Sequence, residues 1–404
     1  MEYKKTIIVS ELSTYISALK EEMQRKKYSD YEIRSMNQIW KELLLYIETN
    51  QDAVFDENYR QNFLQNHYSE ALEIRDSMYR ITRAMNLLLD YIHFHVIFRQ
   101  YNTQKTLFMK GYIEIFTLFL KEESRRGLAE GTLKVYRSRL LRLHDFLIDT
   151  GAESFKEVTQ EQINIYIISL ARFSSTCVSE SLRMIRRLSD YAYQNGYCKK
   201  SFANSIPHVK NLRQQKLPST FTENEINLII NSVDRANPIG KRNYAIFLIA
   251  ARLGLRSGDI CTLKFTDINW DTKTISFTQQ KTRRFLSLPL PDDVGWAVID
   301  YLKNGRPESD SNTIFISHRT PYSSLETISN IIPMQMRSAG IKAPLNRRIG
   351  MHAFRHGLAT LMLEKDIPLP IISQTLGHAD INSTEVYLRI SLKQLSKCGL
   401  KVDL

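Results

Sequence analysis

The stretch that decides the fold class runs from Thr272 to Pro291 and reads TKTISFTQQKTRRFLSLPLP. Apolar and polar residues alternate on both sides of a polar, cationic centre, which is the two-residue period of β-strands. This pattern predicts a β-hairpin with Lys281 at its tip. Elsewhere the apolar residues recur mostly at helical spacing. We therefore expect a mainly α protein, with helical N-terminal domains and a mixed α+β last domain that holds a small antiparallel sheet.

The first 200 residues follow a helical period. One amphipathic run is formed by Ile33, Met36, Trp40, Leu43, Leu44 and Ile47, and a second run covers residues 77–98. Residues 1–108 and 109–200 are both expected to be all-helical. Thr159 and Gln162 have the spacing of a capping box, which predicts the start of a helix.

The two helical stretches resemble each other at an offset of 100 residues. SDYEIRSMNQIWKELLLYIE begins at Ser29, and AEGTLKVYRSRLLRLHDFLI begins at Ala129. The matched pairs are Ile33 with Leu133, Leu43 with Leu143, Tyr46 with Phe146, Ile47 with Leu147, and Asp90-Tyr91 with Asp190-Tyr191. Any two amphipathic helices could align in this way. The other interpretation is a duplicated helical domain.

A linker separates these stretches from the last domain. Residues 204–221, NSIPHVKNLRQQKLPSTF, hold two prolines and several cations but no acidic residue. Thr222 and Glu225 then form a second capping-box pattern. The expected domains are residues 1–108, residues 109–213 with the linker, and residues 214–404.

Composition limits the partners. The chain has 404 residues and a formal net charge of +12, which suits DNA, RNA or an anionic membrane surface. The four cysteines show no zinc or redox spacing. The longest apolar stretch, Tyr244 to Ala251, is too short to span a bilayer, and the N-terminus lacks the pattern of a signal peptide. We expect a cytoplasmic protein without a membrane partner.

The last domain holds a set of residues suited to cutting a phosphodiester. Attack on phosphorus builds negative charge on the phosphate oxygens, which preorganised arginines can hold through two parallel hydrogen bonds. A nucleophile and a proton donor for the leaving oxygen are also needed. The candidates are Arg256, Lys281, His352, Arg355, His378 and Tyr387, with Asp259 and His356 as supporting residues.

These residues resemble the fingerprint of the tyrosine recombinase, or phage integrase, family. ARLGLRSGDI contains Arg256, MHAFRHGLAT contains His352 and Arg355, and TLGHADINSTEVY joins His378 to Tyr387 nine residues later. The resemblance covers residues 214–404, and more loosely residues 109–213, which resemble the family's core-binding domain. It implies that Tyr387 is the nucleophile, that Lys281 protonates the leaving 5′ oxygen, and that the other four candidates hold the phosphate.

Some of these residues also have interpretations that involve no catalytic role. Lys281 is one of four hairpin cations, with Lys273, Arg283 and Arg284, and such a cluster can be only a solvated face. His352 and His356 have a spacing that can bind zinc, but no glutamate follows His352, and the family that the chain resembles uses no metal. Asp259 would orient the Arg256 guanidinium or cap a turn.

The resemblance also implies partners and a reaction. It implies double-stranded DNA cut at specific sites, a 3′-phosphotyrosyl link, a Holliday junction, and a homo-tetramer on two DNA sites, with room for an accessory DNA-bending or directionality protein. No cofactor is implied. Rival functions are a type IB topoisomerase or a hairpin telomere resolvase with the same chemistry, and a non-catalytic DNA-binding regulator. An RNA- or membrane-surface protein would explain only the charge.

Residues 1–108 depart from the family pattern. Many integrases carry a small arm-binding domain at this place, often with strands, whereas this segment has helical periodicity. We expect an additional DNA- or protomer-binding helical module.

Overall fold

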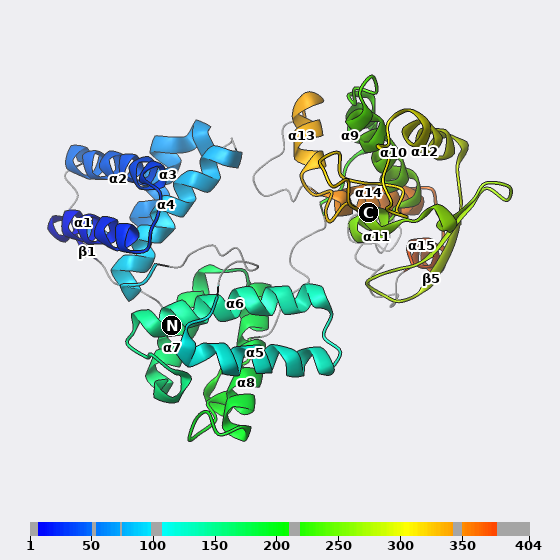
Figure 1. Ribbon diagram of the computed structural model, residues 1–404. Coiled ribbons are helices and arrows are strands. Elements are labelled where there is room, and N and C mark those ends of the chain that lie inside the picture. The colour runs from blue at the N-terminus through cyan, green and yellow to red at the C-terminus, as the bar shows by residue number, and fades with distance from the viewer. Residues whose placement is uncertain are drawn as a thin grey trace, which may run out of the picture. The chain divides into compact units, whose positions relative to one another are not determined.

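The computed structural model describes residues 7–50, 54–72, 75–97, 107–209, 219–341 and 350–377. The chain forms two compact units, residues 1–213 and 214–404 (Figure 1). Both consist mainly of α-helices, and the second also holds a three-stranded antiparallel sheet. The predicted fold class, mainly α with a small sheet in the last domain, is therefore confirmed. Within the ranges described, no helix has both the length and the apolarity needed to cross a membrane.

The first unit begins with a four-helix set. Its helices are α1 (Val9–Arg25), α2 (Asp30–Asn50), α3 (Glu57–Leu72) and α4 (Arg75–Phe94). The core lies around Trp40, which is fully buried and whose indole nitrogen donates a hydrogen bond of 3.0 Å to the carbonyl of Ala84. Two short strands, β1 (Ile7–Ile8) and β2 (Val54–Phe55), pair antiparallel. The expectation of an all-helical segment was wrong in this detail, because a two-residue strand carries no readable period.

A second helical set completes this unit. Its helices are α5 (Lys110–Arg125), α6 (Glu130–Asp149), α7 (Gln160–Ser169) and α8 (Ser175–Gln194), with 3₁₀ turns η1 (Phe155–Glu157), η2 (Leu170–Arg172) and η3 (Ala203–Ser205). The capping box predicted at Thr159 and Gln162 is confirmed: the threonine hydroxyl accepts from the Gln162 amide, and the Gln162 side chain accepts from the Thr159 amide. This motif fixes where α7 begins.

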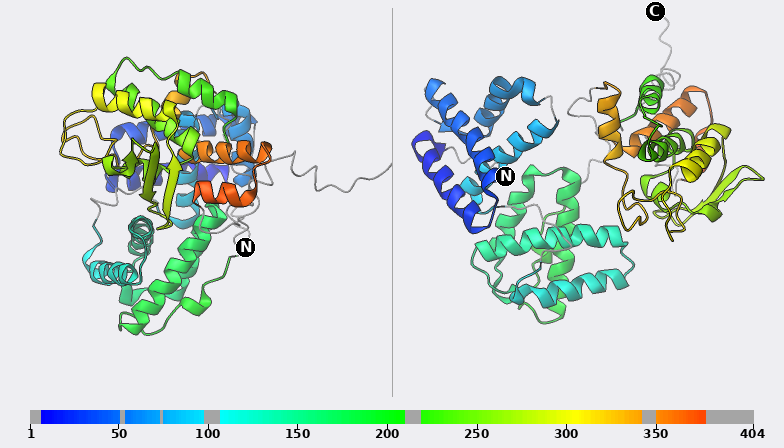
Figure 2. Two further views of the ribbon diagram at one scale, coloured as in Figure 1. Left: turned by 90° about the vertical axis from the view of Figure 1, so that its right-hand side faces the viewer. Right: turned by 45° about the horizontal axis from the view of Figure 1, so that its top comes forward.

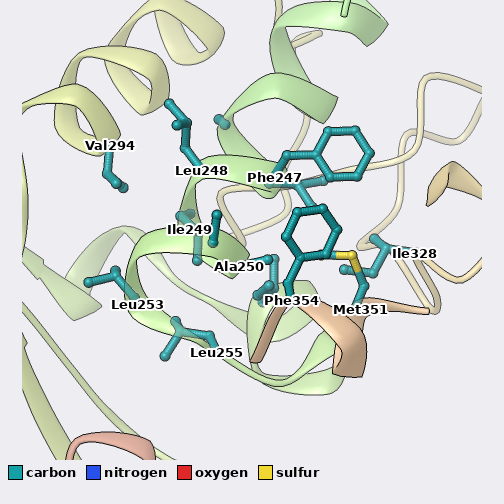
Figure 3. Packing of buried hydrophobic residues seen from close by; sticks show 14 of the residues in the cluster. Phe247, Leu248, Ile249, Ala250, Leu253, Leu255, Val294, Ile328, Met351 and Phe354 are labelled. Carbon is teal, nitrogen blue, oxygen red and sulfur yellow. The ribbon is translucent and has the colours of Figure 1, made fainter. Parts of the chain in front are cut away.

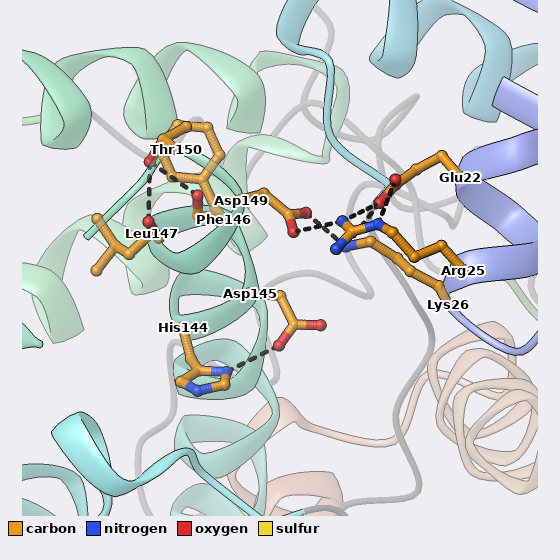
Figure 4. Close-up of polar contacts among 9 residues, drawn as sticks. All are labelled: Glu22, Arg25, Lys26, His144, Asp145, Phe146, Leu147, Asp149 and Thr150. Carbon is orange, nitrogen blue, oxygen red and sulfur yellow. Dashed lines mark hydrogen bonds and ion pairs between the residues drawn. The ribbon is translucent and has the colours of Figure 1, made fainter. Parts of the chain in front are cut away.

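Polar contacts join the two sets (Figure 4). Lys26, at the end of α1, donates a hydrogen bond of 2.5 Å from Nζ to Oδ2 of Asp149, at the end of α6. Asp90 on α4 is buried and forms an ion pair with Arg172 of η2. Breaking a partly buried ion pair leaves an uncompensated charge, so these contacts favour one relative placement of the sets.

The second unit combines helices with the predicted hairpin. Its elements are α9 (Glu223–Asn231), α10 (Pro238–Leu253), α11 (Ser257–Thr262), η4 (Phe265–Asp267), β3 (Ile268–Asn269), β4 (Thr274–Thr278), β5 (Phe285–Pro289), α12 (Asp292–Asn304), α13 (Ile331–Ser338), α14 (Met351–Glu364) and α15 (Leu369–Leu376). The sheet order is β3-β4-β5, with Ile275 opposite Leu288 and Phe277 opposite Leu286. These four side chains are buried and their strand neighbours are more exposed, as the alternating sequence predicted. The capping box at Thr222 and Glu225 is also confirmed.

Helix α10 is the centre of this unit. Its residues from Ala245 to Ala251 are all buried, so the helix is apolar on every side. Phe247 stacks against Phe354 of α14 with ring centroids 5.8 Å apart, and Val294 of α12 belongs to the same core (Figure 3). Because α10 and α14 are fixed by this core, the residues at their ends occupy defined positions. Figure 2 shows the hairpin strands β4 and β5 beside α14 and α15.

Candidate active site

The first arginine of the candidate set lies where α10 ends. Gly254 closes that helix in the left-handed conformation, with φ of 61°, a position that glycine adopts without strain. Two residues later, Arg256 is the N-cap residue of α11. Its side chain is 13% exposed, with Nη1 at 4.0 Å from Oδ2 of Asp259 and Nη2 at 3.5 Å from the carbonyl oxygen of Gly377. The guanidinium therefore lies between α11 and the end of α15, with little of its surface exposed.

The second arginine reaches the same place from α14. Arg355 is 3% exposed, and its guanidinium donates hydrogen bonds of 2.9 Å to the carbonyl oxygen of Gly254 and 2.6 Å to that of Leu376. It thus links the ends of α10 and α15. A buried guanidinium held in place by carbonyl oxygens is preorganised to stabilise negative charge beside it.

Asp259 connects this arginine pair to the hairpin. Its Oδ1 atom accepts a hydrogen bond of 2.9 Å from the backbone amide of Gln280, in the hairpin turn. Burial raises the pKa of the Asp259 carboxyl, while the Gln280 hydrogen bond and the charges of Arg256 and Arg355 act in the opposite direction. Asp259 therefore does both things expected of it: it faces a guanidinium and it caps a turn.

The hairpin turn places Lys281 at an exposed position beside this site. The turn is closed by a hydrogen bond of 2.9 Å from the Gln279 amide to the Arg284 carbonyl. Gln279 is fully buried, and its side chain donates to the carbonyl of Leu376 at 3.2 Å and accepts from Thr282 at 2.6 Å. No feature of the sequence distinguished Gln279 from Gln280. Alternation alone cannot identify a buried turn residue, because the strand period ends where the turn begins.

His352 and His356 lie on α14, as the helical spacing predicted, with ring centroids 6.3 Å apart. Desolvation, followed by the charges of Arg355, Lys281 and Arg256, lowers the pKa of His352. This result also shows that cations from three separate segments act on one imidazole. A neutral imidazole can both donate and accept a hydrogen bond at neutral pH.

The pKa of His356 leads to a pH prediction. Burial, His352 and Arg355 lower this pKa from 6.5 to about 4. Because the folded chain binds the proton more weakly than the unfolded chain, stability is unaffected above pH 6.5 and falls as the pH drops towards 4. By pH 4.5 the loss is expected to be about 2–3 kcal/mol. Urea unfolding at pH 7.5 and 4.5 measures this loss. The free energy of unfolding should fall less between these pH values in the His356→Gln variant than in the parent, and equal losses would contradict this prediction.

Two candidate residues, His378 and Tyr387, lie outside the described residues. The last described residue before them is Gly377, which ends α15 with φ of 61°. A Cβ atom at Gly377 would lie 2.5 Å from Nε2 of Gln279. The absence of a side chain at Gly377 therefore makes room for Gln279 of the hairpin.

A Gly377→Ala substitution is expected to destabilise the second unit by about 3 kcal/mol, from left-handed backbone strain and the displacement of Gln279. Gly340 is a matched control, because it has φ of 68° and no atom within 4 Å of its Cβ position. Gly340→Ala should cost only about 1 kcal/mol. Thermal unfolding distinguishes the two, and equal shifts would rule out the steric term.

The structure thus brings six of the eight predicted residues into one unit, on the α10–α11 junction, the hairpin turn and α14. Gly254 and Gln279 were not singled out from the sequence, although their contacts position Arg355 and the hairpin. Arg256, Arg355 and Lys281 provide positive charge, Asp259 is buried beside it, and His352 supplies a neutral donor. Chemically, this arrangement can hold a phosphate monoanion and stabilise further negative charge on its oxygens.

Comparisons with known proteins agree with this chemistry. Residues 219–394 match the family model described as "Phage integrase family", and residues 112–207 match "Phage integrase SAM-like domain". Putative integrase/recombinase y4gC of Sinorhizobium fredii is 37% identical over 185 residues, which cover 46% of this chain and 95% of the relative. Tyrosine recombinase XerC of Oceanobacillus iheyensis is 25% identical over 299 residues, which cover 72% of this chain and 95% of that relative.

A solved structure shares the fold. The XerH site-specific recombinase, bound to a palindromic difH substrate in a post-cleavage complex, superposes with a TM-score of 0.55 at 17% identity. The match covers 78% of this chain and 95% of that chain. The family models, the relatives and the arginine pair agree, and the chain belongs to the phage integrase family of tyrosine recombinases.

Proposed function

We propose that this chain cuts and rejoins double-stranded DNA at specific sites through a covalent 3′-phosphotyrosyl intermediate on Tyr387. The observation that carries the proposal is the meeting of Arg256 and Arg355 at the ends of α10 and α15. The chain continues from this point through His378 to Tyr387. Two neighbouring guanidinium groups can bind a phosphodiester and stabilise the negative charge that develops on its oxygens during attack.

The reaction conserves the phosphodiester bond energy. The Tyr387 oxygen attacks phosphorus and the bond to the 5′ oxygen breaks, while Lys281 donates a proton to that leaving oxygen. Arg256, Arg355, His352 and His378 hold the phosphate oxygens. An unperturbed phenol has a pKa near 10, so the surrounding cations would favour the phenolate. The products are a 3′-phosphotyrosine and a 5′-hydroxyl, and attack by a 5′-hydroxyl of the partner duplex reverses the step.

The assembly follows from strand exchange between two sites. Four protomers on two DNA sites would exchange strands in two steps through a Holliday junction, in the cytoplasm and on the nucleoid. The helical set 109–213 and the catalytic residues 214–404 would both contact the duplex, and most of the affinity would come from phosphate contacts that weaken with salt. Residues 1–108 would add a further DNA- or protomer-binding module. An accessory DNA-bending protein would set direction.

A covalent trapping experiment tests the proposal. The full chain is incubated with a library of nicked duplexes of random central sequence, so that cleavage releases a short strand and the adduct cannot reverse. Recombinase chemistry predicts an adduct on a restricted set of sequences, with a nucleotide-linked peptide that contains Tyr387 in mass spectrometry. Relaxation of supercoiled plasmids regardless of sequence would identify a topoisomerase, and hairpin-ended products would identify a telomere resolvase. Binding without any adduct would identify a regulator and overturn the proposal.

A further inference from the structure

The two helical sets of the first unit correspond residue by residue. The helix order is the same, and the starts of α2 and α6, and of α4 and α8, differ by 100 residues. The first helix of each set packs on the second and the fourth. The same offset pairs buried positions throughout, at 12 and 112, 16 and 116, 19 and 119, 36 and 136, 40 and 140, 43 and 143, 47 and 147, 84 and 184, 88 and 188, and 92 and 192.

The turn after the first helix has the same geometry in both sets. Lys27 and Gly127 both have positive φ, 57° and 85°. In each set the next residue, Tyr28 or Leu128, donates a backbone hydrogen bond to the carbonyl of residue 23 or 123, at 3.0 and 3.1 Å. This ending is frequent at helix C-termini, so what it contributes is its position, which falls at the same 100-residue offset as the buried residues.

The two residues of one ion pair in the second set both have apolar counterparts in the first set. Glu123, which is fully buried, forms an ion pair of 2.8 Å with Arg187 in the second set. At the corresponding positions of the first set, Met23 and Leu87 are both buried. Both residues of an ion pair have apolar counterparts, which is the exchange that leaves no unpaired charge. The same two positions therefore belong to the core of the first set and form an ion pair in the second.

The first set carries a groove lined by polar and apolar residues of α2, α3 and α4. It has a volume of about 470 Å³ and its lining includes Arg34, Gln38, Glu42, Tyr68 and Arg80. Glu42 is engaged within the set, because it accepts hydrogen bonds from the Tyr68 hydroxyl and from Gln38. Arg34 and Arg80 are exposed and form no ion pair with any residue described in this structure, so their charge is accessible to an anion in the groove. Tyr31, at the same groove, is 73% exposed.

We propose that residues 7–97 are a second copy of the SAM-like domain, and that its groove between Arg34 and Arg80 binds the phosphate backbone of the DNA that flanks the recombination site. This inference rests on the proposed function. At the matched positions the second copy has Lys134 for Arg34 and Glu180 for Arg80, so the pair of groove arginines is specific to the first copy. Guanidiniums beside tyrosine and glutamine side chains are the usual groups that contact sugar and phosphate.

The net charges of the two copies indicate how the first copy would contact DNA. Residues 1–108 hold 14 Lys and Arg against 15 Asp and Glu, whereas residues 109–213 hold 17 against 11. The first copy therefore has no general attraction for DNA and depends on the local groove. The Lys26–Asp149 pair (Figure 4) and the Asp90–Arg172 pair attach it to the second copy. It extends the DNA contact of its neighbour rather than binding alone.

The test compares short and long DNA with the full chain. One duplex covers only the central site, and the other extends it by roughly 15 base pairs, about one and a half helical turns, on each side. The parent should bind the long duplex about tenfold more tightly than the short one. The Arg34→Ala/Arg80→Ala variant should lose this difference, and its slope of log affinity against log salt on the long duplex should fall by about 2. Lys20→Ala/Lys27→Ala removes the same charge outside the groove and should leave both quantities unchanged.

Three results would overturn the inference. In the first, both double variants change the affinity equally. In the second, the parent binds the two duplexes with equal affinity. In the third, the Arg34→Ala/Arg80→Ala variant lowers the number of protomers on DNA but still prefers long DNA. Covalent adduct formation on the short duplex reports on the catalytic unit alone. If the parent formed no adduct on the short duplex, the proposed function would be refuted. If the Arg34→Ala/Arg80→Ala variant still formed this adduct but no longer preferred long DNA, the loss would be due to the groove alone.

Discussion

Replacing Tyr387 with phenylalanine is expected to abolish the covalent protein–DNA adduct, with cleavage lower by on the order of 10⁴-fold or more. The substitution removes one oxygen atom, and with it the only atom that could form the bond to phosphorus. Affinity for the DNA site should stay within about twofold, because affinity comes mainly from phosphate contacts elsewhere. Denaturing gels of a nicked duplex selected by trapping measure the adduct, and a gel shift measures binding.

Tyr322→Phe is the matched control, because it makes the same change in the same unit. It should form the adduct at the rate of the parent. An adduct formed equally by Tyr387→Phe would remove this residue from the nucleophile role. Loss of adduct in both variants together with loss of folding would instead point to a general sensitivity to hydroxyl removal.

Replacing Arg355 with lysine is expected to lower both activity and stability. A single ammonium group cannot reproduce the two hydrogen bonds to the carbonyl oxygens of Gly254 and Leu376 and still present a planar fork to phosphate. We expect adduct formation to slow by about 10²–10³-fold. Leaving a buried carbonyl oxygen unpaired should cost about 2–3 kcal/mol, which lowers the melting temperature of this unit by about 5–10 °C.

Arg252→Lys provides the comparison for this prediction. Arg252 lies on the same helix that ends at Gly254, but it is half exposed and pairs with Asp293 at 3.1 Å on the surface. An exposed pair contributes little, so its change should alter the free energy of unfolding by less than about 1 kcal/mol. If Arg355→Lys behaved like Arg252→Lys in both assays, the buried hydrogen bonds would have neither a structural nor a catalytic role.

The contrast between these two arginines shows where sequence reasoning stops. Arg355 was predicted from the His-x-x-Arg element of the family that the chain resembles, and the helix expected to carry His352 and Arg355 is present. The hairpin from Thr272 and both capping boxes were also predicted, because each depends on residues within a few positions of one another. The contacts of Arg355 could not be predicted. Its acceptors lie 101 and 21 residues away, and only the packing of α10, α14 and α15 brings them together.

The same division applies to the rest of the molecule. Sequence alone indicated the helical and strand periods, the 100-residue resemblance and the order of the candidate catalytic residues, because all of these are patterns along one dimension. Tertiary structure decided that Asp259 holds the hairpin turn, that buried Gln279 occupies the space beside Gly377, and that Lys26 and Asp90 attach the first helical set to the second. Each of these contacts depends on which side chains meet when helices distant in sequence pack into one core, and local periodicity carries no information about that choice.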